Sequence, residues 1–325
     1  MSVRRIKPVV PHGTYEYRLG HGVTERLAGV IRERNGGSRV LVVRDMERKF
    51  RATGIADLFE AEGYEVATHT LGTDGSPRTD TLDAATSILG AATTAGLTEA
   101  DAIVAVGDAG TLAAAGFAAG TYRGGIDLIT VPADALTMVD TGAGEPWRVM
   151  TDTEGTSFAA VEHTPLLVLA AMDALPAGVD EDMRSAFLAI LRTSLLDRSH
   201  QFEQFGQDIG KLMAREEARV LAAFIRGIEG KARVQHVAHE AGMPIDEPFW
   251  FGETFARALG AVELGLTGAE RLAEGLRFES RLAVEVAGLD PETVFELDRS
   301  WAALGFGVEP FSVTAHELFA ALEET

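Results

Sequence analysis

Three carboxylates stand beside large aromatic side chains in two short stretches of the sequence, a combination that could transfer protons. The first stretch, MVDTGAGEPWRV, carries Asp140, Glu145 and Trp147. The second stretch, EPFWFGETFAR, carries Phe249, Trp250, Glu253 and Arg257. Aromatic surroundings disfavour the charged form of a carboxyl group and raise its pKa toward the range useful for acid–base chemistry. The two stretches therefore predict a pocket for a relatively apolar small molecule, with Glu253, Glu145 and Asp140 as candidate catalytic groups.

Two other interpretations of these residues stay open. The aromatic side chains could fill a closed core instead of lining a pocket. Glu253 and Arg257 are four residues apart in a helical pattern, so they could form a simple ion pair on one helix face. Such a pair would oppose any rise in the pKa of Glu253.

The composition limits the classes of partner. The 325 residues include 46% hydrophobic residues, enough for two packed domains, and no cysteine. A disulfide framework and a thiolate metal site are therefore excluded. The net charge of −20 argues against nucleic acid, whose phosphates bind mainly to Lys and Arg. No apolar run approaches the roughly 20 residues that a membrane span needs, so we expect a cytoplasmic protein that does not contact membranes.

The elements that must position these residues follow two different patterns. In the first half, strand patterns at residues 15–19, 39–43, 65–70, 102–106 and 128–131 alternate with helical patterns at 23–33, 46–62, 79–95 and 110–120. This alternation predicts a mostly parallel sheet covered on both faces, in which ligands bind beyond the carboxyl ends of the strands.

The second half is predicted to be helical. Apolar residues recur at spacings of three and four at residues 180–197, 199–227, 229–241, 249–264, 267–287, 291–303 and 313–323. We therefore predict an α/β plus all-α protein, with a Rossmann-like domain at residues 1–175 and an all-helical domain at residues 176–325.

Several landmarks carry a resemblance to a known family. GFAA stands at Gly116–Ala119, TY at Thr121 and Tyr122, VP at Val131 and Pro132, and MVD at Met138–Asp140. Their order and spacing resemble the 3-dehydroquinate synthases and their sugar-phosphate cyclase relatives. The resemblance implies an active site in the cleft between the two domains, a bound NAD, a zinc or cobalt ion, and a homodimer.

The residues that would hold these cofactors are largely replaced. Asp45 matches the family's ribose-binding Asp, and Gly107 remains from its glycine turn, so these two are the weak candidates for cofactor binding. Asp108 puts an anion where backbone amides should approach a pyrophosphate. Of the metal ligands, the Glu is replaced by Leu188 or Ala189, and the first His by Glu253. We therefore expect no metal site and no required cofactor.

Fewer substrate-binding residues match the family. His163 and Lys231 match its His-Gln-Pro turn and a lysine-bearing helix, and Arg123 stands one place from its arginine. The family's Gly-Gly-Lys lysine aligns with Pro146. The candidate substrate-binding residues are therefore Trp147, Trp250, Phe249, Arg257, Lys231, His163 and Arg123.

The sequence leaves three hypotheses for function. The first is a metal-free, NAD-free cyclase, lyase or isomerase of bacterial specialised metabolism, acting on a relatively apolar small molecule by acid–base chemistry. The second is a non-catalytic pseudoenzyme that binds a partner or ligand. The third is a sugar-phosphate cyclase that still uses NAD and a metal.

Overall fold

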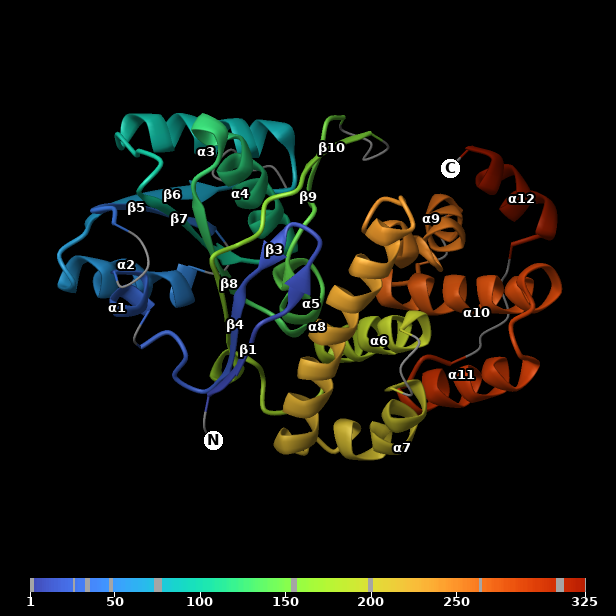
Figure 1. The fold of residues 1–325 in the computed structure, drawn as a ribbon. Helices are drawn as coiled ribbons and strands as arrows, with labels where there is room; N and C mark the ends of the chain where they lie inside the picture. Colours follow the sequence, from blue (N-terminus) through green and yellow to red (C-terminus); the bar gives the residue numbers. More distant parts are fainter. Residues whose placement is uncertain are drawn as a thin grey trace. The chain divides into compact units, whose positions relative to one another are not determined.

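The computed structural model describes residues 3–25, 27–32, 36–46, 49–72, 78–152, 157–197, 201–262, 265–307 and 313–324. The chain divides into two compact units, Met1–Pro176 and Ala177–Thr325 (Figure 1). Each unit has its own architecture.

A mostly parallel sheet forms the centre of the N-terminal unit. Within the described residues it has seven strands in the order β1-β4-β11-β8-β7-β5-β6, and only the edge strand β1 pairs antiparallel. Its strands are β1 (Arg4–Ile6), β4 (Glu16–Gly20), β5 (Arg39–Asp45), β6 (Glu65–Leu71), β7 (Ala102–Gly107), β8 (Asp127–Pro132) and β11 (Leu167–Ala171). The strand β7 is buried along its whole length, as expected of a parallel strand covered on both faces.

Helices cover both faces of this sheet (Figure 1). On one face α3 (Leu82–Thr94) and α4 (Ala109–Thr121) pack into a core that includes Ile88, Leu112 and Trp147. On the other face α1 (Leu27–Arg32) and α2 (Lys49–Ala61) pack into a core that includes Ile31 and Phe59. The predicted Rossmann-like sheet is confirmed, as are the five strands that were expected.

Six shorter or less regular strands were not predicted. They are β1, β11, the hairpin of β2 (Val9–Val10) and β3 (Gly13–Thr14), and the pair β9 (Trp147–Met150) and β10 (Phe158–Val161). The strand β11 has the apolar sequence LVLAA, whose lack of alternation does not distinguish a buried strand from a helix. Between β8 and β9 the chain forms α5 (Ala135–Val139) and a 3-10 turn, η2 (Thr141–Ala143).

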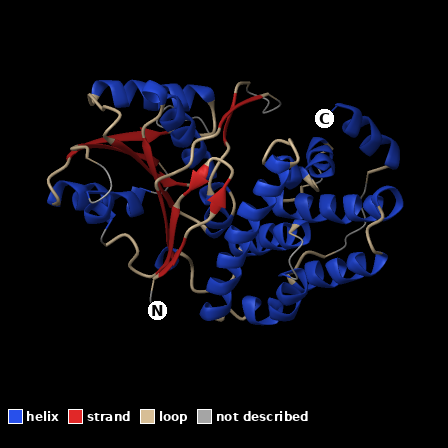
Figure 2. Cartoon of the chain, viewed as in Figure 1, coloured by secondary structure: helices blue, strands red, loops and turns tan. Residues whose placement is uncertain are grey.

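The C-terminal unit contains only helices within the described residues (Figure 2). They are α6 (Glu181–Leu196), α7 (Gln201–Met213), α8 (Glu217–Glu240), α9 (Glu253–Ala261), α10 (Gly268–Ala287), α11 (Pro291–Ala303) and α12 (Ala315–Glu324), with a 3-10 turn, η4 (Glu247–Trp250), before α9. The predicted helical character is confirmed.

One predicted helix boundary is wrong. A break was expected near residue 228, but α8 continues through it. The chain breaks earlier, between α7 and α8, where Arg215 has a φ of 59°. Gly227 allows close packing and does not end the helix, because a Cβ atom there would lie 2.8 Å from Ile190 Cγ1.

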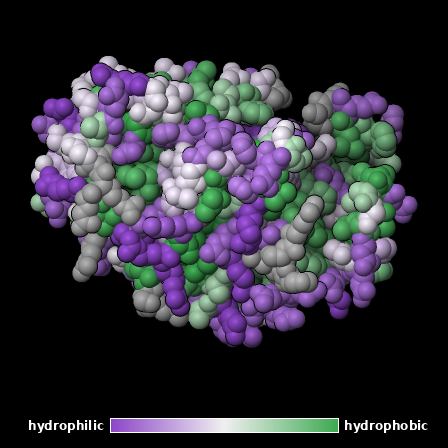
Figure 3. Space-filling model, viewed as in Figure 1, coloured by the Kyte–Doolittle hydropathy of each residue, from purple (hydrophilic) through white to green (hydrophobic). Residues whose placement is uncertain are grey.

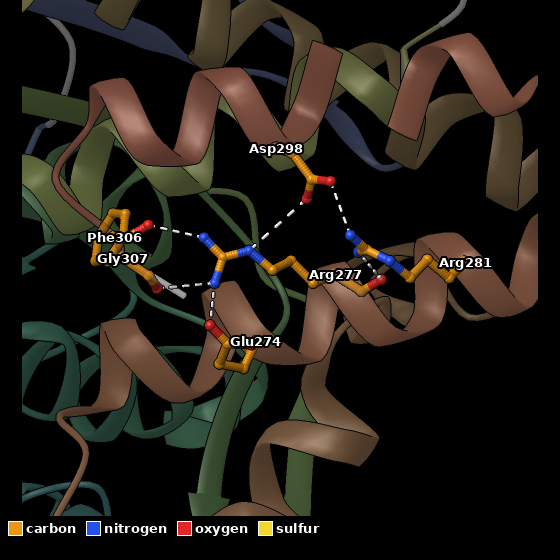
Figure 4. Close-up of polar contacts among 6 residues, drawn as sticks. All are labelled: Glu274, Arg277, Arg281, Asp298, Phe306 and Gly307. Atoms are coloured by element: carbon orange, nitrogen blue, oxygen red, sulfur yellow. Dashed lines mark hydrogen bonds and ion pairs between the residues drawn. The ribbon is translucent and has the colours of Figure 1, made fainter. Parts of the chain in front are cut away.

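A buried arginine joins helices in the C-terminal unit (Figure 4). Arg277 on α10 is 4% exposed and donates to the carbonyl oxygens of Phe306, at 2.7 Å, and Gly307, at 3.0 Å. Its guanidinium also contacts Glu274 and Asp298. The chain after α11 is thereby held against α10 by a charged group that donates to two of its carbonyl oxygens.

Hydrophilic side chains spread over much of the visible surface, with smaller apolar areas between them (Figure 3). Among the described residues, no helix is both long enough and apolar enough to cross a membrane.

Candidate functional site

The carboxyl ends of β5 and β7 place Asp45 and Gly107 side by side. Asp45 is the last residue of β5 and is only 6% exposed. A Cβ atom on Gly107 would lie 2.8 Å from Asp45 Oδ2 and 2.7 Å from Thr111 Cβ. Glycine is therefore required at this position by the protein's own side chains, which occupy the space in front of it.

The first turn of α4 is capped by a carboxylate. Asp108 is the N-cap residue, in an extended conformation, and its Oδ1 accepts a hydrogen bond from the Thr111 amide at 3.0 Å. A Cβ atom on Gly110 would lie 2.5 Å from Thr79 Oγ1, so this glycine is also covered. A pyrophosphate needs free amides and positive potential at a helix N-terminus. The residues at this position do not fit the phosphates of a dinucleotide.

Trp147 belongs to the core of the N-terminal unit. Its side chain has no exposed surface, and it packs so closely on Gly116 of α4 that a Cβ atom there would overlap the indole ring. The indole Nε1 donates to the carbonyl oxygen of His163 at 2.7 Å. The expectation that Trp147 lines a pocket is therefore corrected: it fills the space between α4 and β9.

His163 and Arg123 each contact a neighbouring residue of the N-terminal unit. The Nε2 atom of His163 is 2.8 Å from the carbonyl oxygen of Ile126, a contact that joins two loops of the same unit. Arg123 is exposed, has a left-handed φ of 51°, and holds its guanidinium 5.7 Å from the ring centroid of Tyr122. Both contacts account for these residues structurally.

The loop after α5 carries the candidate acids Asp140 and Glu145. Asp140 is half-buried at the end of α5, and its carbonyl oxygen accepts from the Ala143 amide at 2.9 Å. The side chain of Glu145 has no exposed surface. Burial raises the pKa of Glu145, His12 opposes this rise by its charge and hydrogen bond, Glu162 adds to it, and Thr164 opposes it.

Two residues that the sequence did not single out complete this carboxylate's surroundings. His12, in the turn of the β2–β3 hairpin, has Nδ1 3.2 Å from Glu145 Oε1 and Nε2 3.1 Å from Glu162 Oε2. Tyr15 donates its hydroxyl to the carbonyl oxygen of Ala143, and its pKa is raised by burial and then by the charge of Glu145. No sequence pattern connects His12 with residues more than a hundred positions later, so only the fold reveals this cluster.

In the C-terminal unit, the turn η4 brings an aromatic pair next to a buried lysine. Phe249 is 7% exposed, whereas Trp250 is 42% exposed. Lys231 on α8 is 7% exposed and places Nζ 5.7 Å from the ring centroid of Phe249. This distance is within the range of a cation–π interaction. Three of the candidate substrate-binding residues are thus neighbours.

The carboxylate of Glu253 pairs with an arginine from another helix. Arg192 on α6 is 5% exposed, and its Nη1 donates to Glu253 Oε1 at 2.9 Å and to the carbonyl oxygen of Phe249 at 2.8 Å. The expected ion pair of Glu253 with Arg257 within α9 is therefore corrected: Glu253 pairs with Arg192, and Arg257 is exposed. The signal for Arg192 was its position as the one cation in the apolar run FLAILRTSLL.

Close backbone contact fixes the start of α9. Gly252 has a φ of 89°, and the carboxylate of Glu279 on α10 accepts from the amides of Gly252, at 2.7 Å, and Phe255, at 3.3 Å. A Cβ atom on Gly275 would overlap the carbonyl oxygen of Gly252. Glu253 is therefore presented from a helix end that α10 holds in place.

The residues of the C-terminal unit do not fit a metal ion of the kind the resemblance implied. Leu188 and Ala189 of α6 are buried among apolar side chains, and Glu253 is engaged with Arg192. Across the part of the chain that the structure describes, no three His, Asp or Glu side chains form a group that could hold a metal. The group beside Glu253 is the guanidinium of Arg192, whereas a divalent cation would need further oxygen or nitrogen ligands there.

The parallel sheet with helices on both faces, followed by a helical unit, defines a Rossmann-like α/β plus all-α protein. Residues 72–184 match the family model described as 3-dehydroquinate synthase N-terminal. The chain is 25% identical over 303 residues to the 3-dehydroquinate synthase of Agrobacterium fabrum, covering 91% of this chain and 79% of that protein. It is 29% identical over 252 residues to the 3-dehydroquinate synthase of Pyrobaculum neutrophilum, covering 76% and 71%.

Solved structures agree with these sequence matches. A 2-deoxy-scyllo-inosose synthase complexed with carbaglucose-6-phosphate, NAD+ and Co2+ superposes with a TM-score of 0.80 at 19% identity, covering 98% of this chain and 88% of that chain. The 2-epi-5-epi-valiolone synthase of Streptomyces hygroscopicus, with NAD+ and Zn2+ bound, gives a TM-score of 0.74 at 18% identity, covering 100% and 89%. The sequence is thus similar to the 3-dehydroquinate synthases, and the fold is similar to those of these two synthases.

Proposed function

We propose that this protein is a metal-free and NAD-free enzyme, a cyclase, lyase or isomerase, that acts on a relatively apolar small molecule by proton transfer. The single observation that carries the proposal is the contact between Arg192 and Glu253 at 2.9 Å. The protein's own cation here holds a partly exposed carboxylate at a fixed place.

The contact assigns a separate role to each residue. Burying a guanidinium group costs several kcal/mol unless its N–H donors find acceptors. One nitrogen of Arg192, Nη1, donates both to the carbonyl oxygen of Phe249 and to the carboxylate of Glu253. Arg192 is the proposed positioning residue, because it is almost fully buried. Glu253, whose side chain is 41% exposed, is the proposed proton acceptor or donor, since exposure lets it meet a ligand.

The aromatic turn supports an apolar ligand. Trp250 keeps 42% of its surface exposed directly before α9, where its ring can cover an apolar group. Phe249, the preceding residue, is buried, and its carbonyl oxygen accepts a hydrogen bond from Arg192. In this proposal Trp250 contacts the ligand and Phe249 positions that contact.

The absence of a required dinucleotide is supported by the strand ends of the N-terminal unit. Asp108 already accepts a hydrogen bond from the Thr111 amide in the first turn of α4, and the space before Gly107 is filled. An added phosphate would meet a carboxylate instead of free amide donors. The alternative, a sugar-phosphate cyclase that uses NAD and a metal, is favoured by the bound groups of the two structural relatives and opposed by these residues.

A trapping experiment tests the role of Glu253. The full chain, Glu253→Gln, Trp250→Ala and the matched control Thr254→Ala on the same helix are purified without additives. Native mass spectrometry and fragmentation then identify any small molecule that copurifies. We expect wild type and T254A to release product, E253Q to release a different molecule, the substrate, and W250A to release little. Release of the same molecule in equal amount from all four chains would contradict the proposal.

A second candidate, a pseudoenzyme that binds a partner protein, is favoured by one surface of α10. Phe278, Leu282 and Val286 are four residues apart and are 43%, 46% and 74% exposed. Monomeric proteins seldom leave such a stripe uncovered. In the trapping experiment this candidate predicts that none of the four chains releases a small molecule.

A further inference from the structure

A hollow lies between two helices of the C-terminal unit, α7 and α11, which pack side by side (Figure 1). Its volume is about 510 Å³, and sites for small molecules have volumes of roughly 300–1,000 Å³. None of its lining residues belongs to the candidate site around Glu253. The residues that give the hollow its shape and charge are Phe202, Glu203, Gly206, Glu296, Arg299 and Ser300.

Helical spacing places these residues on one face of each helix. Glu203 and Gly206 are three residues apart on α7, and Glu296, Arg299 and Ser300 lie within one turn and a residue on α11. Residues three and four apart share a helix face. The hollow therefore has a carboxylate on its α7 wall and both signs of charge on its α11 wall.

A buried hydroxyl group faces the hollow. Ser300 is 6% exposed, and a Cβ atom on Gly206 would have Ser300 Oγ as its nearest neighbour across the hollow, at 3.9 Å. Ser185 and Ser194 on α6 donate to the carbonyl oxygen four residues earlier. Within the residues that the structure describes, the hydroxyl of Ser300 makes no such bond. Because buried polar groups normally have a partner, this hydroxyl is available to a ligand.

The charged groups of the hollow are available as well. Glu203, Glu296 and Arg299 form no ion pair or hydrogen bond with any part of the chain that the structure describes. Two carboxylates against one guanidinium leave one negative charge in excess, and the net charge of −20 attracts cations to the surface. The hollow therefore suits a molecule with an ammonium group for the carboxylates and a carboxylate for the guanidinium.

We propose that this hollow binds an amphoteric small molecule, an amino acid with an apolar side chain. The ammonium group of the ligand lies against Glu203 and Glu296, and its carboxylate pairs with Arg299. Phe202, which is half-buried, contacts the apolar side chain, and Ser300 forms a hydrogen bond with the polar end. The site is independent of the proposed proton transfer, so either proposal can fail alone.

Three probes with one aromatic ring and different charges test the class of ligand. They are L-phenylalanine, 2-phenylethylamine, which has no carboxylate, and 3-phenylpropanoate, which has no amino group. Saturation-transfer difference NMR titrations with the full chain measure each affinity. We expect saturable binding of phenylalanine, about tenfold weaker binding of the amine, which loses one charged contact, and the weakest binding of the acid, which the two carboxylates repel.

Gly206 allows a variant that fills the hollow. A Cβ atom there meets only Ser300 Oγ, at 3.9 Å, so the side chain of Gly206→Leu would enter the hollow with little strain. The matched control is Gly210→Leu, one turn later on α7, which is exposed, has no atom within 4 Å of a Cβ and does not line the hollow. We expect G206L to weaken the binding of phenylalanine several-fold and G210L to leave it unchanged.

Two charge variants identify the ends of the ligand. Arg299→Gln, at an exposed position, should weaken phenylalanine about tenfold and leave 2-phenylethylamine unchanged, because it removes only the partner of the carboxylate. Glu203→Gln should weaken both probes. Absence of saturable phenylalanine binding to wild type, or equal affinities in wild type, G206L and R299Q, would overturn the inference. Neither outcome affects the trapping experiment, whose variants are at other positions.

Discussion

At the residue scale, the notable feature of this chain is that several charged side chains are buried. Arg192 and Lys231 are 5% and 7% exposed, and the Glu145 side chain is not exposed at all. Buried charges are costly and add little net stability compared with apolar residues of similar volume. Their presence supports a polar site rather than a cavity that is filled with apolar side chains.

Removal of Arg192 should destabilise the C-terminal unit. Arg192→Ala deletes the donor to the buried carbonyl oxygen of Phe249 and leaves Glu253 without this cation. We expect a loss of about 1–3 kcal/mol in the free energy of unfolding, measured with urea. Glu253→Gln, which removes only a partly exposed charge, should cost less than about 1 kcal/mol. Equal losses in the two variants would argue against the positioning role of Arg192.

The raised pKa of Glu145 predicts a pH dependence of stability. A carboxyl group with a raised pKa in the folded state binds its proton more tightly there than in the unfolded chain. Its contribution is complete below the ordinary value of 4.5 and is lost as pH rises through the folded pKa. The stability of wild type relative to Glu145→Gln should therefore decline above pH 4.5, as followed by urea unfolding. A difference that stays constant with pH would refute this prediction.

Asp108 is expected to stabilise α4 as its N-cap. Asp108→Ala removes the acceptor for the Thr111 amide and should lower the free energy of unfolding by about 0.5–2 kcal/mol. Asp108→Asn keeps an acceptor without the charge and should cost only a few tenths of a kcal/mol. Thermal and urea unfolding of both variants would check this order, and the reverse order would mean that the charge, not the cap, is important.

At the scale of elements, the sequence predicted the regular parts and missed those that depend on tertiary contacts. The strands β5, β7 and β8 contain apolar runs and are six or seven residues long, and the long helices repeat apolar residues at helical spacing. The hairpin of β2 and β3 has two residues in each strand and no such period. Tertiary contacts also explain why α8 continues past Gly227, which packs on Ile190.

The candidate site was predictable only where one element carries it. Phe249, Trp250 and Glu253 lie close together in the sequence, on one turn and the helix after it. The sequence alone could therefore group them. The contacts of Glu253 with Arg192, and of Glu145 with His12, join residues separated by 61 and 133 positions. No spacing rule connects such distant residues, because the packing of elements brings them together.

The packing of α9 against α10 depends on a glycine. Gly275→Ala would place a methyl group against the carbonyl oxygen of Gly252, and the resulting strain should cost on the order of 1–3 kcal/mol. Gly268→Ala on the same helix meets no atom within 4 Å and should leave stability unchanged or slightly raised. Urea unfolding compares the two variants, and similar values for both would show that α9 does not need this close contact.

At the scale of the whole molecule, the fold and the residues of the candidate site support different functions. The fold is similar to synthases whose structures contain NAD+ and a metal, whereas this chain has a net charge of −20, an aspartate cap on α4 and an arginine paired with Glu253. The homodimer implied by the resemblance stays a prediction.

Binding of NAD+ and of Zn2+ or Co2+ to the full wild-type chain, titrated separately and together by isothermal titration calorimetry, tests the central claim most directly. We predict no saturable heat for NAD+ at concentrations up to about 1 mM, which corresponds to a binding free energy weaker than about −4 kcal/mol, and no stoichiometric metal binding. Stoichiometric binding of NAD+ together with one metal ion per chain would contradict the account.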